Sequence, residues 1–124
     1  MRDYRNTAAY QHARGLLAHV YAFTGRSGPG QGAEAAASVT SALRRAAIGA
    51  AASLVEGGAA RSDGDYHRCL LRAKTALSEF PRLVNLCQLR DQLTPQTARL
   101  LLSEQAEASA ALEGLIAEAA ELAS

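Results

Sequence analysis

The histidines and cysteines of this chain lack the spacing that metal binding or nucleophilic catalysis requires. His12 and His19 lie seven residues apart, and two helical turns would separate them by about 10.5 Å, too far for one metal ion. His67 and Cys69 lie two residues apart, so on a helix their side chains point away from each other. We therefore interpret the first two histidines as partly exposed polar positions, and the second pair does not form a nucleophile with its base.

The glutamates also lack the pattern of a metal-binding enzyme. Helical bundles hold pairs of iron or manganese ions with a Glu-x-x-His sequence on two helices, and no glutamate here has His at the third following position.

The glycine-rich segment lacks the context of a phosphate-binding loop. Gly28, Gly30 and Gly32 follow no strand pattern and precede no Gly-Lys-Ser or Gly-Lys-Thr, so a phosphate-binding loop is not expected. The sequence predicts a protein that is not an enzyme and binds no metal or cofactor.

Charge is distributed unevenly along the chain. Residues 1–39 carry 4 basic and 2 acidic side chains, residues 40–90 carry 8 and 4, and residues 91–124 carry 1 and 6. The basic middle presents a stripe on the outward face of its predicted helix: Arg68, Arg72, Lys74, Arg82 and Arg90. Such a stripe is either a solvated surface or a nucleic-acid contact, and both interpretations stay open. The acidic tail should repel phosphates, so nucleic acid must contact other helices.

Several features favour a cytoplasmic protein without a membrane segment. No apolar run follows the first four residues, so a secretory signal is not expected. The longest uncharged apolar stretch, residues 46–55, is about half of what spans a bilayer. Cys69 and Cys87 lie 18 residues apart in one predicted helix, roughly 27 Å by rise, so they cannot form a disulfide with each other. We expect buried, reduced thiols.

The composition predicts one all-α domain, residues 1–124. Hydrophobic residues make up 48% of the chain and aromatic residues 5%, so most of the apolar content is helix-forming Ala and Leu. Helices are expected at about 6–24, 34–60, 63–92 and 95–122, with a Gly-rich connection at 25–33. Starting signals are Asn6 or Thr7, Ser62, and Thr94 before Pro95. Within the third helix, Pro81 predicts a kink and not a break.

The second predicted helix is the centre of this arrangement. Residues 46–55 carry no charge on any side, and a helix that is apolar all round must be covered on more than one face. One chain of this size can cover only part of it, so we expect an antiparallel, up-down-up-down four-helix bundle that assembles as a homo-oligomer. The second apolar face of this helix is the predicted interface between chains: Ile48, Ala51, Ala52 and Val55.

Two charged residues border this apolar stretch. Arg45 and Glu56 are 11 residues apart, roughly 16 Å along a helix, so they cannot pair with each other. Each is expected to form an ion pair with another helix or another chain, because a lone charge at the edge of a packed seam is costly. The alternative is that both point into solvent.

Helices 34–60 and 63–92 resemble a bacterial four-helix-bundle family. The resemblance is carried by Leu43-Arg44-Arg45-Ala46-Ala47-Ile48, by Glu56-Gly57, and by Ser62 before a helix with Leu77-Ser78-Glu79-Phe80. These segments resemble the family of the 23S rRNA intervening sequence protein, which includes the accessory variability determinant of diversity-generating retroelements. The resemblance implies a homopentamer that associates with RNA, DNA or a reverse transcriptase through basic residues, here Arg44, Arg45, Arg61, Arg68 and Arg72.

The sequence thus predicts a non-enzymatic oligomeric bundle whose basic residues meet nucleic acid. The competing hypothesis is a protein-binding scaffold or adaptor, without nucleic-acid contact, whose grooves hold a helix or tail of another chain.

Overall fold

All regular secondary structure that the structure describes is helical. The computed structural model describes residues 2–24 and 33–123, with the side chains of 33–38 excepted. A short 3₁₀ helix, η1 (Tyr4–Asn6), precedes α1 (Ala8–Thr24), α2 (Ala33–Gly58), α3 (Asp63–Leu89) and α4 (Pro95–Ala123). The all-α prediction is therefore confirmed for these residues. The Gly-rich connection with Gly28, Gly30 and Gly32 lies outside the described ranges, apart from the helical residue 33.

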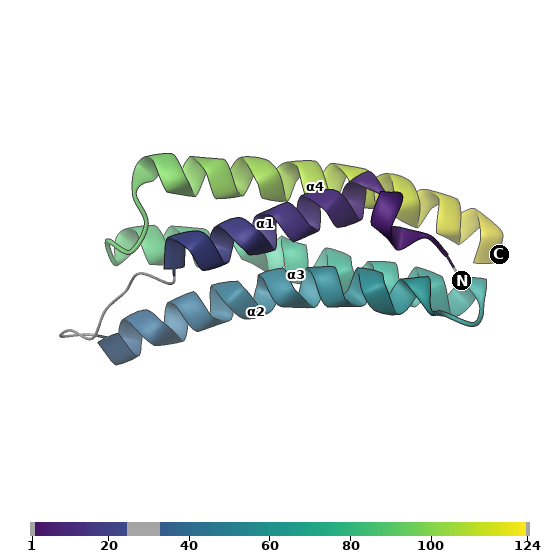
Figure 1. Cartoon of the computed structure of the whole chain (residues 1–124), viewed down its shortest axis with the longest axis horizontal. Helices are drawn as coiled ribbons and strands as arrows, with labels where there is room; N and C mark the ends of the chain where they lie inside the picture. The colour runs from purple at the N-terminus through teal and green to yellow at the C-terminus, as the bar shows by residue number, and fades with distance from the viewer. Residues whose placement is uncertain (1, 25–32, 124) are drawn as a thin grey trace.

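The four α-helices run alternately in opposite directions and lie side by side (Figure 1). Each helix contacts its neighbours in the sequence, and α1 also contacts α4, so the contacts close into a ring. The diagonal pairs, α1 with α3 and α2 with α4, make no backbone-level contact within the described part of the chain. This arrangement is that of the predicted up-down-up-down bundle. The most extensive contact is between α2 and α3.

Three predicted capping residues hold the helix starts. The Oγ1 of Thr7 accepts a hydrogen bond from the Tyr10 amide at 3.2 Å. The Ser62 hydroxyl accepts from the amide three residues on at 3.1 Å, and the Thr94 hydroxyl does the same at 3.1 Å. Each bond satisfies a first-turn N–H that has no partner inside the helix. The predicted starts at Thr7, Ser62 and Thr94 are therefore confirmed.

The third helix ends at Leu89, earlier than the predicted residue 92. Asp91 adopts a left-handed backbone with φ of 57°. Its N–H donates to the Gln88 carbonyl at 3.0 Å, and the Gln92 N–H donates to the Cys87 carbonyl at 2.9 Å. This pair of bonds is the Schellman arrangement that terminates helices. Asp is an uncommon residue for the left-handed position, so the residue types near Asp91 do not mark this helix end clearly.

Pro81 leaves α3 unbroken, as predicted, because another helix replaces the hydrogen bond that proline removes. Proline has no N–H to donate to the carbonyl four residues earlier, and that carbonyl belongs to Leu77. The Nε2 of Gln105 on α4 donates to this oxygen at 3.0 Å. The helix therefore continues through Pro81 with the freed carbonyl satisfied. The kink itself stays a prediction.

The core lies between all four helices and contains few aromatic residues. Phe80 is fully buried, and so are the large aliphatic side chains of the same core: Leu16, Val20, Leu43, Leu70, Leu77, Val84, Leu101 and Leu112. Ala46, Ala47 and Ala50 are also buried, and such small side chains allow helices to approach closely. In contrast, Ile48 and Val55 on α2 are 41% and 40% exposed. One chain therefore covers only part of the apolar circumference of α2, as expected.

No helix within the described ranges combines the length and hydropathy that would let it cross a bilayer.

Candidate anion-binding groove between α2 and α3

A groove with a volume of about 550 Å³ runs between α2 and α3. On α3 its lining residues recur at intervals of three and four, so they share one helical face. On α2 they occupy one turn. The described side chains that line the groove are Ala42, Arg45, Ala46, Arg72, Thr75, Ala76, Glu79, Arg82 and Leu83. Three guanidinium groups and one carboxylate thus surround a floor of small apolar side chains.

Small residues set the distance and register between the two helices. A Cβ placed on Gly49 would lie 3.6 Å from the Cβ of Ala76, and one on Gly57 would lie 3.3 Å from the Cβ of Cys69. Because the helices are antiparallel, the residue one turn before Gly49 on α2 lies opposite the residue one turn after Ala76 on α3. Arg45 is therefore level with Glu79. This register brings charges from two helices to the same part of the groove.

Arg72 joins α3 to the end of α2. Its Nη2 donates to the Oε2 of Glu56 at 2.9 Å and lies 3.1 Å from the Sγ of Cys69. The predicted partner of Glu56 on another helix is thus found within the same chain. Both side chains of this pair are more than half exposed, so the pair contributes little stability and its guanidinium remains accessible from solvent.

Arg45 and Arg82 are exposed and form no ion pair with any described side chain. For Arg45, the predicted partner on another helix is therefore not present among the described residues, and the alternative of a solvent-facing side chain holds within one chain. Glu79, level with Arg45 and one turn before Arg82, likewise forms no ion pair there. This part of the groove therefore carries two guanidinium groups and one carboxylate, and its net charge is positive.

The five arginines of the predicted nucleic-acid set do not converge. Arg45 and Arg72 line the groove, but Arg44 is half-buried and ties α2 to α1. Its Nε donates to Thr24 Oγ1 at 2.9 Å, and its guanidinium lies 5.2 Å from the centre of the Tyr21 ring. Arg68 pairs with Asp65 one turn earlier on α3, and Arg61 is exposed in the connection between α2 and α3. Arg44 therefore lies outside the groove, and its nucleic-acid contact stays a prediction.

Arg82 lines the groove although it was not in the predicted set. It was visible in the sequence as part of the basic stripe, and its separation of ten residues from Arg72 places both on one helical face. The other stripe residues do not line the groove, and Lys74 instead pairs with Glu113 of α4 at 2.9 Å. The packing of α2 against α3 therefore decides which basic residues of α3 line the groove and which do not.

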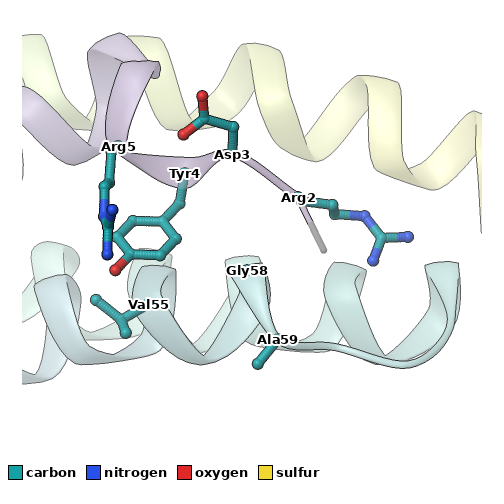
Figure 2. Close-up of a pocket in the computed structure, with 7 residues that line it drawn as sticks. All are labelled: Arg2, Asp3, Tyr4, Arg5, Val55, Gly58 and Ala59. Carbon is teal, nitrogen blue, oxygen red and sulfur yellow. The ribbon is translucent and has the colours of Figure 1, made fainter.

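A second cavity, of about 360 Å³, lies where the N-terminal segment crosses the end of α2 (Figure 2). Tyr4 lies against α2 between Val55 and Gly58. Arg2 is engaged with the chain itself: it donates to the Ala60 carbonyl at 3.2 Å, pairs with Asp63, and lies 4.4 Å from the centre of the Tyr66 ring. Burial raises the pKa of the Tyr66 hydroxyl. The cavity is thus bounded on one side by the N-terminal segment and on the other by the end of α2, a contact that the sequence did not indicate.

The histidines of α1 each pair with a different glutamate of α4. His19 Nδ1 contacts Glu104, and His12 Nδ1 lies 3.3 Å from Glu107. Both imidazoles are partly exposed, as predicted. Within the described part of the chain, no three His, Cys, Asp or Glu side chains are grouped so that they could hold a metal ion.

In comparisons with known proteins, no family model and no curated protein matches this chain.

Proposed function

We propose that this chain is a non-enzymatic, homo-oligomeric four-helix-bundle protein of the cytoplasm that associates with RNA or DNA through the groove between α2 and α3. The observation that carries the proposal is the convergence of Arg45, Arg72 and Arg82 on one concave surface. Guanidinium groups recognise phosphate oxygens through paired N–H donors. The acidic side chains of α4 belong to another part of the ring of helices, since α4 and α2 make no backbone-level contact within the described residues.

The oligomeric part of the proposal rests on the exposed apolar residues of α2. Ile48, Ala52 and Val55 are exposed and Ala51 is half-buried, and a second copy would remove these side chains from water. The resemblance to the family of the 23S rRNA intervening sequence protein implies five copies. Repetition of the groove around such a ring would let several weak phosphate contacts act together.

A salt titration tests the nucleic-acid contact. We expect the chain to bind labelled RNA and DNA at low salt, with affinity falling steeply as salt rises, because neutralised phosphates release their counterions. Replacing both Arg45 and Arg82 with Gln should reduce the slope of log affinity against log salt by about 1.4 for a single strand. Arg99→Gln, which removes one exposed charge from α4, is the control and should leave binding unchanged.

Absence of binding at low salt, or a slope that the double variant does not alter, would contradict a phosphate contact in the groove. The competing function is a scaffold for another protein, for which the resemblance suggests a reverse transcriptase. The exposed apolar side chains on α2 favour it. Under that function, a protein partner should remain bound after nuclease treatment and at moderate salt, and it should dissociate when Ile48 and Val55 are replaced with Gln.

A further inference from the structure

Glu79 is an unexpected residue for a surface that contacts only phosphates. Its carboxylate lines the groove, level with Arg45 and one turn before Arg82. It is exposed and forms no ion pair with a described side chain. A carboxylate at this position repels any phosphate that approaches the arginines. The groove therefore suits a ligand that has negative charge at the arginines and a hydrogen-bond donor between them.

An ionised carboxylate only accepts hydrogen bonds, so its partner must present N–H or O–H groups. Among the bases of a nucleic acid, cytosine, adenine and guanine present exocyclic amino groups as such donors. Uracil and thymine have a carbonyl at the equivalent position, and their single ring N–H lies between two carbonyl oxygens that repel a carboxylate. Glu and Asp accept from the cytosine amino group in known recognition. Glu79 therefore favours bases that carry an amino group.

The remaining surfaces of the groove suit the rest of a nucleotide. Ala46 and Leu83 are buried, with 7% and 9% of their surface exposed, and form an apolar floor against which the flat face of a base can pack. Arginine can stack on a base as well as pair with a phosphate. Arg72 and Arg82 are about 15 Å apart along α3 by helical rise, a length that one or two nucleotides occupy.

From these observations, and resting on the proposed function, we infer that the groove binds single-stranded nucleic acid, with the amino group of an unpaired base on Glu79 and the flanking phosphates on Arg45, Arg72 and Arg82. Duplex nucleic acid fits less well, because its bases are stacked on one another and cannot pack a flat face against Ala46 and Leu83. Glu79 would then determine specificity, and the arginines would supply most of the affinity.

Binding of short oligocytidine and oligouridine RNA of equal length, measured by fluorescence anisotropy at low salt, tests the inference. The two bases differ in the amino or carbonyl group at one ring position and in the adjacent ring nitrogen, which carries a hydrogen only in uracil. We expect the unaltered chain to bind oligocytidine about tenfold more tightly. Glu79→Met, which keeps the side-chain length and helix propensity, should tighten oligouridine binding and remove the difference between the two. Glu118→Met on α4 is the control for loss of an exposed glutamate and should preserve the difference.

The outcomes separate this inference from the function on which it rests. If neither RNA binds, the proposed function fails. If both bind equally and Glu79→Met tightens both by the same factor, the groove contacts phosphates and Glu79 is only a repulsive charge, so the inference fails alone. A duplex that competes as well as oligocytidine overturns the preference for single strands. If Glu79→Met increases the assembled mass without RNA binding, the acidic helix of a second copy occupies the groove and the inference is wrong.

Discussion

At the scale of single residues, glycines allow segments from different parts of the sequence to touch. Gly58 has no side chain where the N-terminal segment crosses α2: a Cβ there would lie 2.4 Å from Cδ1 of Tyr4 and 3.2 Å from the Arg2 carbonyl oxygen. The Arg2 N–H donates to the Gly58 carbonyl at 3.0 Å, so the two backbones are in direct contact. Gly114 on α4, by contrast, has open space around it.

We expect Gly58→Ala to lower the free energy of unfolding by about 1 to 3 kcal/mol, because the added methyl group must displace Tyr4 or the backbone. Figure 2 shows this contact. Gly114→Ala is the matched control and should raise the free energy of unfolding by up to about 1 kcal/mol, since Ala is the better helix former. Urea denaturation of both variants measures the difference. Equal effects of the same sign would show that the N-terminal segment does not dock on α2.

Cys87 gives the protein a dependence on alkaline pH. Burial raises the pKa of its thiol above the usual value of 9.0, so the folded state holds the proton more tightly than the unfolded chain. The corresponding stability is complete below about pH 9 and is lost as the pH rises through the pKa of the folded state. We expect the free energy of unfolding to fall there by up to about 1.4 kcal/mol per pH unit.

Denaturant unfolding of the unaltered chain and of Cys87→Ala measures this loss. The pH values should lie between the usual thiol pKa of 9.0 and the usual Tyr hydroxyl pKa of 10.0. The variant should be less stable at neutral pH, because it leaves a small cavity, but its stability should vary less with pH. Parallel curves for the two proteins would assign the alkaline loss to other groups. Tyr66, whose pKa burial also raises, contributes at higher pH in the same direction.

At the scale of helices, a defect in one element is compensated by another. Pro81 frees the Leu77 carbonyl of α3, and the side chain of Gln105 on α4 donates to it at 3.0 Å while also donating to Ser109 Oγ at 3.1 Å. A carbonyl without this partner would be less well satisfied at the α3–α4 contact. Proline in α3 and glutamine in α4 are therefore coupled, although 24 residues separate them in the sequence.

A double-mutant cycle measures this coupling. We expect Gln105→Leu to lower the free energy of unfolding by about 1 to 3 kcal/mol in the unaltered chain, because the carbonyl of Leu77 loses its donor. In a Pro81→Ala background the new backbone N–H at position 81 should donate to the same carbonyl. There the cost of Gln105→Leu should be much smaller, giving an interaction energy on the order of 1 kcal/mol. Additive effects would refute the compensation.

At the scale of the whole molecule, a single chain exposes apolar side chains and basic residues along α2 and acidic residues along α4. The exposed side chains of Ile48 and Val55 lie on α2, which also carries one wall of the basic groove. The acidic residues gather on α4, which lies diagonally opposite α2 and makes no backbone-level contact with it in the described part of the chain. Association of copies through α2 would bury the apolar side chains while leaving the acidic helix in solvent. The proposed oligomer and the proposed nucleic-acid contact therefore both depend on α2.

Replacing both Ile48 and Val55 with Gln should reduce the assembled mass, measured by light scattering, without a loss of helical content by circular dichroism. Each apolar side chain contributes about 1 kcal/mol when its exposed part is buried, and an amide buried without partners opposes association further. Leu89→Gln, at a leucine that is 81% exposed on α3, is the control and should not change the mass. A chain that is monomeric before any substitution would contradict the oligomer.

Local sequence patterns determined the elements of this protein. Thr7, Ser62 and Thr94 begin their helices because a capping hydroxyl reaches amides within one turn, and the apolar spacing within each helix selects its buried face. The exposure of Ile48 and Val55 also followed from the sequence, since residues 46–55 are apolar all round and a chain of 124 residues cannot cover them.

Only the tertiary structure decided which distant residues meet. Arg45, Arg72 and Arg82 converge while Arg44 turns toward Thr24, Glu56 finds Arg72, and Gln105 reaches the Leu77 carbonyl. These contacts depend on the register and rotation of one helix against another, which many small side chains set together. A shift of one residue turns a helical side chain by about 100°, so periodicity within a single helix cannot specify its partner on the next.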